Sequence, residues 1–277
     1  MSIAIVTDSS CQLSTQQIVD AGISVVPIPV VIDDVEYADG VDLSAVEFYE
    51  RIGDGVTLST SLPSPGAFIA AWMAAKEQGA SEIVSIHVGL EHSGTLNSAR
   101  LAADELDIPV HLIDSKTSSY GLGIVVLGIA KRLAERPTTD GIHEFADALI
   151  AGIGTVFILQ DLQYVLKGGR MRQAKLPTGA DDVPVLGGVG GGYELLGTGR
   201  TIDELVDKMA ATLLDGDHRR HVAVAFAAPD TIEFTEKLEA IAEASPLVET
   251  VHRYRMGPAI AVHTGPGTAG GFQWPVT

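Results

Sequence analysis

The residues of this sequence best suited to chemistry stand in one short stretch, His92-Ser93-Gly94-Thr95. A strand-like apolar run from Ile83 to Val88 precedes the stretch, and apolar residues at helical spacing follow it from Leu96 onward. The first amides of a helix have no partner within the helix and lie at the positive end of its dipole. A hydroxyl beside glycine at such a turn can therefore bind an anion. The simpler interpretation is that Ser93 only caps the helix.

Two other stretches combine hydroxyl groups with turn-forming residues. Thr60-Ser61-Leu62-Pro63-Ser64-Pro65 carries three hydroxyls, and its two prolines restrict the backbone. Ile113-Asp114-Ser115 ends a predicted strand, and a second hydroxyl- and glycine-rich helix start follows at 118–123. Each stretch alone is weak evidence, because Ser or Thr before proline is a common way for a helix to begin.

The second half of the chain contributes basic and glycine-rich turns. Lys167-Gly168-Gly169-Arg170 offers a guanidinium suited to a carboxylate or phosphate, and His263-Thr264-Gly265-Pro266-Gly267 offers an imidazole. A solvated arginine and an ordinary loop histidine are the simpler interpretations. The glycine run at 187–192 lacks a following helix start, so it predicts a turn between two strands rather than a dinucleotide site.

Composition excludes several classes of function. A net charge of -18 disfavours nucleic acid, whose phosphates would be repelled, and 46% hydrophobic residues over 277 positions allow a large core. We expect no stable insertion into a membrane, because no apolar stretch is long enough to span one. Cys11 is the only cysteine and no signal peptide is evident, so a cytoplasmic location is expected. The eight histidines lack metal-ligand spacing, and we expect neither metal nor other cofactor.

Strand and helix patterns alternate through the first half of the chain. They predict a mostly parallel sheet covered by helices on both faces, with ligands bound beyond the carboxyl ends of the strands. In this interpretation the turns at Ser61, Ser93 and Asp114 all fall at that edge. The predicted strands lie at about 3–7, 82–88 and 110–113, and the predicted helices at about 14–21, 44–52, 64–75, 121–134 and 140–151, with one more from about 93.

The pattern changes from about Thr155. A strand at 156–159, helices near 202–214 and 232–244, and strands near 221–227 and 248–254 predict a second α+β domain. We therefore expect an N-terminal α/β domain over residues 1–153 and a C-terminal α+β domain over residues 154–277.

Taken in order, the short motifs of the chain resemble those of the DegV family of bacterial proteins over most of its length. No single motif is decisive, but their order makes the set specific. They are V-T-D-S at 6–9, D-G at 39–40, T-S-x-P-S at 60–64, S-G-T at 93–95, V-x-x-I-D-S at 110–115, G-x-G at 121–123, K-G-G-R at 167–170, and G-P at 257–258 followed by H-T-G-P-G at 263–267.

The resemblance implies a two-domain protein that binds one long-chain fatty acid between its domains. Some members of the family present that acid to a separate kinase, which converts the carboxyl group to an acyl phosphate. The resemblance places the carboxylate against Thr60 or Ser61 and against the Ser93-Gly94-Thr95 turn. It also implicates His263, Arg170 and Arg200 near the head group. The chain departs from the family at His92, usually apolar, and at 180–183, where Ala-Asp-Asp-Val replaces an apolar stretch.

A buried carboxylate is tolerable only where several donors replace its water, and hydroxyls and helix amides can do so without a full positive charge. The tail would dominate affinity, since each buried methylene contributes about 0.8 kcal/mol and a sixteen-carbon chain gains on the order of 10 kcal/mol gross.

An enzyme is the main alternative: a serine hydrolase of lipids or esters with Ser93 as nucleophile, His92 or His263 as base and Asp114 as orienting acid. Ser93 lacks the G-x-S-x-G context of such enzymes, and adjacent residues such as His92 and Ser93 usually point apart. A third class, a pure interaction module, would have no internal apolar tunnel. We expect a carrier without catalytic activity.

Overall fold

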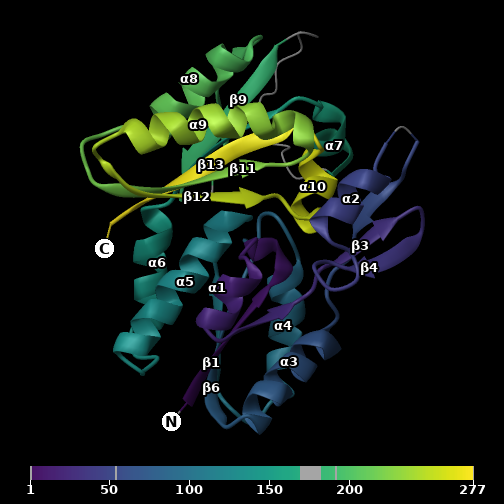
Figure 1. Cartoon of the computed structure of the whole chain (residues 1–277). Helices are drawn as coiled ribbons and strands as arrows, with labels where there is room; N and C mark the ends of the chain where they lie inside the picture. The colour runs from purple at the N-terminus through teal and green to yellow at the C-terminus, as the bar shows by residue number, and fades with distance from the viewer. Residues whose placement is uncertain (1, 54, 169–181, 191, 277) are drawn as a thin grey trace. The chain divides into compact units, whose positions relative to one another are not determined.

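The computed structural model describes residues 2–53, 55–168, 182–190 and 192–276. The chain divides into two compact units (Figure 1). The first unit comprises Met1–Ser44 and Gly55–Ala151, and the second comprises Ala45–Asp54 and Gly152–Thr277. The short helix α2 (Ala45–Arg51) therefore groups with the second unit, although it lies within the N-terminal part of the sequence.

A four-stranded sheet forms the centre of the first unit, and its neighbouring strands are all parallel. This confirms the predicted parallel α/β sheet. Its strand order is β2-β1-β6-β7, with β1 at Ser2–Asp8, β2 at Ile23–Val26, β6 at Ala80–His87 and β7 at Val110–Asp114.

Helices α3 (Pro65–Glu77) and α4 (Thr95–Ala103) pack on one face of this sheet, where Val6, Phe68, Trp72 and Ile83 share a buried apolar cluster. Helix α5 (Tyr120–Glu135) lies on the other side with α6 (Ile142–Ala151) beside it (Figure 1). The predicted helix starts are confirmed locally. Ser14 forms a reciprocal capping box at α1 (Thr15–Asp20), and Ser64 caps α3 just before its proline.

A separate antiparallel sheet holds the strand that leads to Ser61. Its order is β4-β3-β5, with β3 at Pro29–Ile32, β4 at Val35–Ala38 and β5 at Leu58–Thr60. The Ser61 turn therefore follows a strand of this antiparallel sheet. Pro27 and Pro29 interrupt the apolar run at 23–32. Its first half therefore pairs as β2 in the parallel sheet, and its second half pairs as β3 in the antiparallel sheet.

The second unit contains a six-stranded sheet of order β10-β9-β8-β13-β11-β12, in which only the β11–β12 pair is parallel. Helices α8 (Ile202–Leu213) and α9 (Ile232–Ala244) contribute to one apolar cluster with it. Strands β9 and β10 pair antiparallel, so the chain turns between two strands here, as predicted; Gly187 and Gly188 themselves lie within β9. The strands are β8 (Gly154–Leu159), β9 (Val183–Val189), β10 (Glu194–Gly199), β11 (Arg220–Phe226), β12 (Val248–Arg255) and β13 (Thr268–Pro275).

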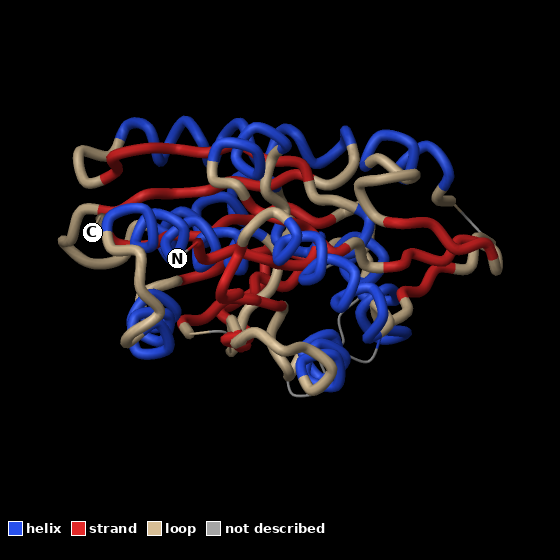
Figure 2. The backbone as a smooth tube through the Cα atoms, turned by 90° about the horizontal axis from the view of Figure 1, so that it is seen from below, coloured by secondary structure: helices blue, strands red, loops and turns tan. Residues whose placement is uncertain are grey.

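Short helices complete the two units: η1 (Ser9–Cys11) in the first, and α7 (Leu162–Gly168), η2 (Pro229–Thr231) and α10 (Pro258–Thr264) in the second. Figure 2 shows the helices and strands from below the view of Figure 1. Within the described ranges, no helix is both long and apolar enough to cross a membrane.

Candidate functional site

The turn at 93–95 places two hydroxyls side by side. Ser93 Oγ lies 2.8 Å from Thr95 Oγ1, and it accepts a hydrogen bond of 3.2 Å from the Thr95 amide. Gly94, not Ser93, occupies the N-cap position of α4, although the Ser93 hydroxyl accepts from the amide of the first helical residue, Thr95. The simpler interpretation of Ser93 as the N-cap residue was therefore wrong. The pair stands at the start of α4, where the first amides have no acceptor within the helix.

Gly89 allows the backbone to fold tightly before this turn. Its amide donates to the Thr117 carbonyl at 2.8 Å, and a Cβ at this position would lie 2.8 Å from the carbonyl carbon of Lys116. Its own carbonyl accepts from the amides of His92 and Ser93, at 2.9 and 3.1 Å. A side chain at position 89 would push the loop away from the strand end and displace Ser93.

The 60–64 turn meets the 93–95 turn within the first unit. A Cβ added to Gly94 would lie 2.9 Å from Leu62 Cδ1, so Leu62 packs directly on Gly94. Thr60 is half-buried at the end of β5, whereas Ser61 is exposed and donates from Oγ to the Glu36 carboxylate at 3.1 Å. The structure thus brings together the two hydroxyl turns that the sequence singled out.

The remaining candidate residues belong to the second unit. His263 is half-buried in the last turn of α10. Arg200 is exposed, and its Nε donates to Asp182 Oδ1 at 2.7 Å; this hydrogen bond raises the pKa of the guanidinium. Asp182 comes from the polar stretch that departs from the family pattern. Arg170 lies outside the described residues.

Within the first unit, Ser93 and Asp114 form hydrogen bonds other than those of the predicted hydrolase arrangement. Ser93 pairs with Thr95, and the Asp114 carboxylate accepts from the amides of Leu90 and Lys116, at 3.2 and 3.0 Å. Among the described residues neither Ser93 nor Asp114 bonds to a histidine side chain. Asp114 instead holds the loop that follows β6. Within the same residues, no group of three or more His, Cys, Asp or Glu side chains is placed to hold a metal ion.

A family model described as "Uncharacterised protein, DegV family" matches residues 2–275. The chain belongs to the DegV family. Curated DegV domain-containing proteins are similar over nearly their whole length. One from Staphylococcus aureus is 31% identical, covering 96% of each chain, and one from Deinococcus radiodurans is 32% identical, covering 98% of this chain and 97% of the relative.

Solved structures of similar proteins share the fold of this chain. A fatty-acid-binding DegV family protein from Thermus thermophilus superposes with a TM-score of 0.91 at 28% identity, and the match covers all of both chains. A stearic-acid-binding protein from Eubacterium ventriosum gives a TM-score of 0.86 at 25% identity, covering 99% of this chain and 98% of that one.

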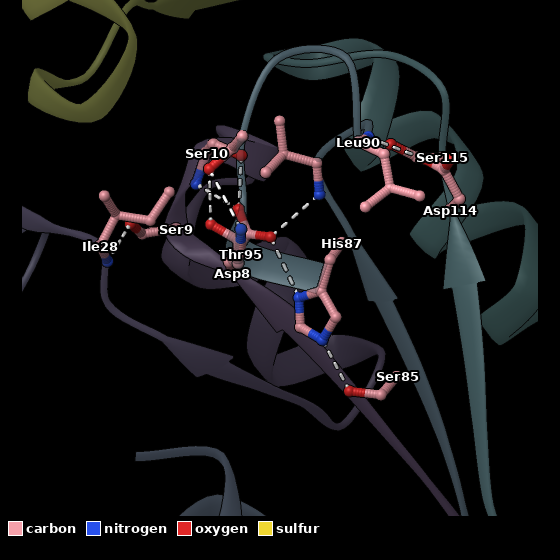
Figure 3. Close-up of polar contacts among 12 residues, drawn as sticks. Asp8, Ser9, Ser10, Ile28, Ser85, His87, Leu90, Thr95, Asp114 and Ser115 are labelled. Atoms are coloured by element: carbon pink, nitrogen blue, oxygen red, sulfur yellow. Dashed lines mark hydrogen bonds and ion pairs between the residues drawn. The ribbon is translucent and has the colours of Figure 1, made fainter. Parts of the chain in front are cut away.

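Two fully buried polar side chains of the first unit, Asp8 and His87, were not identified from the sequence as functional. Asp8, at the end of β1, accepts from His87 Nδ1 and from the Val88 amide, both at 3.0 Å (Figure 3). It also accepts from the Ser10 amide and hydroxyl. Asp8 stands in a family motif, but His87 lies in an apolar run that predicts only a core strand. The single local signal was strand alternation, which places Ile83, Ser85 and His87 on one face.

Proposed function

We propose that this DegV protein binds one long-chain fatty acid and holds its carboxylate at the 93–95 turn. The observation that carries the proposal is the hydroxyl pair of Ser93 and Thr95, 2.8 Å apart at the start of α4. The neighbours from Thermus thermophilus and Eubacterium ventriosum, described as fatty-acid-binding and stearic-acid-binding, support the same ligand.

The geometry favours recognition of the carboxylate head group by uncharged hydrogen-bond donors. The Ser93 and Thr95 hydroxyls and the Gly94 amide can replace water around a carboxylate, and hydrogen bonds to a charged group are the strong ones. The Thr95 amide donates to Ser93 Oγ in this structure and would exchange that acceptor for the carboxylate. Of the two candidates in the 60–64 turn, Thr60 is the better ligand. The Ser61 hydroxyl already donates to Glu36, whose negative charge would repel a second carboxylate.

We assign His263 of the second unit to binding of the carboxylate. We assign Arg170 and Arg200 to the reaction of a partner at the head group, where a separate kinase would convert the bound carboxyl group to an acyl phosphate. Arg200 must then exchange Asp182 for the ligand or the phosphoryl group, because its Nε is engaged in this structure. In this proposal the protein is a carrier with no catalytic activity of its own.

The proposal is tested by gentle purification, solvent extraction and mass spectrometry, which should find fatty acid at about one equivalent per chain. Ser93→Ala should weaken binding of the acid about tenfold, the effect of one lost hydrogen bond to a charged group. Ser98→Ala is the matched control, because it removes a buried hydroxyl from the same helix one turn later. Extraction of no lipid, with no binding of added acid, would refute the carrier function.

The role of Arg170 is tested separately with a cognate kinase. Arg170→Ala should impair phosphorylation of the bound acid more than it impairs binding of the acid. Unchanged phosphorylation would show that this arginine has been assigned wrongly.

A further inference from the structure

A continuous line of hydrogen bonds runs through the buried interior of the first unit. Trp72 Nε1 donates to Ser85 Oγ at 3.2 Å, Ser85 Oγ lies 2.7 Å from His87 Nε2, and His87 Nδ1 lies 3.0 Å from Asp8 Oδ2. All four side chains are fully buried. We call Trp72, Ser85, His87 and Asp8 the buried polar network; Figure 3 shows its part from Ser85 to Asp8.

The donors of this network all point toward Asp8. An indole N–H can only donate, so Ser85 Oγ accepts from Trp72 and has its own proton left to give. That proton goes to His87 Nε2, which leaves the ring hydrogen on Nδ1, facing Asp8. This assignment gives every polar atom of the line a partner.

The order of groups in the network matches that of a hydrolytic triad: carboxylate, imidazole and hydroxyl. Its surroundings do not permit that chemistry. Ser85 has no exposed surface, and its oxygen already accepts from Trp72. No substrate can reach the hydroxyl, so the network needs a different explanation.

The two ends of the network lead to the two hydroxyl turns. Trp72 lies on α3, and Phe68, one turn nearer its start, packs edge-to-face on His87 with ring centroids 5.0 Å apart. Helix α3 begins at the Ser64 cap, so it carries the 60–64 turn on its N-terminus. At the other end, Asp8 holds the amide of Val88, the first residue after β6 in the loop that leads to Ser93.

We propose that the buried polar network is a positioning device that sets the spacing of the 60–64 and 93–95 turns, and thereby lets the site prefer a carboxylate to a neutral head group. The inference rests on the proposed fatty-acid binding and adds residues that never touch the ligand. His87 is its central positioning residue, because it alone connects Ser85, which contacts α3, to Asp8, which holds the loop. Leu62 on Gly94 is the direct contact whose fit the network maintains.

The test measures head-group preference rather than affinity alone. Delipidated protein is dialysed against labelled dodecanoate and, separately, labelled dodecanol, and the ratio of the two dissociation constants is taken. The tail is the same in both ligands, so general loosening of the fold weakens both, whereas displaced donors weaken only the acid. We expect His87→Leu to lower the preference for the acid about tenfold, as for loss of one charge-assisted hydrogen bond.

Two variants separate positioning from packing. His87→Asn places an amide N–H near the position of Nδ1 and should restore most of the preference. His111→Leu is the matched control: His111 Nε2 also lies 3.0 Å from a carboxylate, Glu82, but at the opposite end of β6 and β7. It should leave the preference unchanged. Should His87→Leu not fold, Ser85→Ala cuts the same network with a smaller change and should lower the preference as well.

The outcomes distinguish this inference from the proposed function. If the unmodified protein binds dodecanol as tightly as dodecanoate, the carboxylate site itself is wrong. If it prefers the acid and His87→Leu or Ser85→Ala keeps that preference, or His87→Asn restores nothing, the positioning role is wrong and the proposed function stands. The inference is supported if His87→Leu loses the preference for the acid, His87→Asn recovers it and His111→Leu keeps it.

Discussion

Each unit of the protein buries a charged side chain completely or nearly so, and the two charges are opposite in sign. Asp8 in the first unit has no exposed surface, and Arg220 in the second is 1% exposed. Asp8 accepts from two amides, a hydroxyl and an imidazole, and Arg220 donates to the carbonyls of four residues, Leu213, Asp215, Gly216 and His218. Hydrogen bonds within the protein replace the lost water in both units.

The difference lies in how far along the chain the partners stand. The imidazole and amide that Asp8 binds at its Oδ2 are 79 and 80 residues away, at the end of another strand. All the carbonyls around Arg220 lie within seven residues, where they close the end of α8 and the loop after it. Asp8 therefore ties elements together beside the candidate site, whereas Arg220 fastens a local loop. Removing each should produce correspondingly different damage.

The largest effect is expected for Asp8→Leu, which leaves four buried donors without an acceptor. It should lower the free energy of unfolding by roughly 3–5 kcal/mol. Asp8→Asn keeps one acceptor oxygen and should cost less, while turning an amide N–H toward a donor. Urea unfolding of both variants measures the effect. If Asp8→Leu were as stable as the unmodified protein, Asp8 would not be connecting distant parts of the chain as we infer.

A smaller and purely local effect is expected for Arg220→Met. The freed carbonyls of the loop after α8 can turn to water, because residues 215–219 are exposed. The loss should be about 1–3 kcal/mol. Hydrogen exchange should accelerate at the end of α8 and in this loop, and binding of fatty acid should not change. A changed preference for dodecanoate over dodecanol in this variant would show that Arg220 does more than hold its local loop, and would contradict the contrast with Asp8.

The same contrast explains which features could be predicted from the sequence. The capping box of Ser14 and the Ser64 cap involve residues three positions apart, so local spacing contains the whole interaction. The contact of His87 with Asp8 spans 79 residues, and no short pattern records it. The two hydroxyl turns were recognised from composition. That they meet through Leu62 and Gly94 depends on the packing of α3 against the sheet, which the sequence pattern does not specify.

Strand β13 was missed for a related reason. Gly270 and Gly271 in its centre resemble a loop, but a Cβ at Gly270 would lie 2.3 Å from the Val156 carbonyl oxygen. The glycine is needed because two strands approach closely there, and that requirement exists only in the folded protein. Similarly, Ser93 is a better helix cap than Gly94 by residue type, yet its hydroxyl is used by Thr95.

A third charged side chain extends the comparison to a carboxylate that is not fully buried. Glu82 is partly exposed and accepts from Thr139 Oγ1 at 2.7 Å and from His111. The hydrogen bond from Thr139, followed by that of His111, lowers the pKa of Glu82. A lowered pKa stabilises the fold above the ordinary pKa of glutamate, and this contribution is lost as the pH falls through the lowered value.

We therefore expect Glu82→Gln to cost less than about 1 kcal/mol at neutral pH, as is usual for partly exposed pairs. The cost should shrink as the pH falls through the lowered pKa of Glu82, because the unmodified protein loses the same contribution there. Thermal unfolding at pH 7 and pH 3 measures both values. A cost as large as that of Asp8→Leu would show that burial does not decide the strength of these carboxylate contacts.

The smallest effect at neutral pH concerns Cys11, three residues after Asp8 and 2% exposed. Burial raises the pKa of its thiol to about 12, and the negative charges of Asp8 and Asp39 add to the rise. Asp8 is surrounded by donors, whereas burial of Cys11 favours the neutral thiol. Iodoacetamide at pH 8 should leave the folded protein unmodified and alkylate it fully in urea.

Above pH 9 the thiol ionises only in the unfolded chain, so stability should fall as the pH rises toward 12. Cys11→Ser should make the loss of stability between pH 9 and pH 12 smaller. Rapid alkylation of the folded protein by iodoacetamide would show that the thiol is accessible and ionised beside Asp8, which would contradict both predictions.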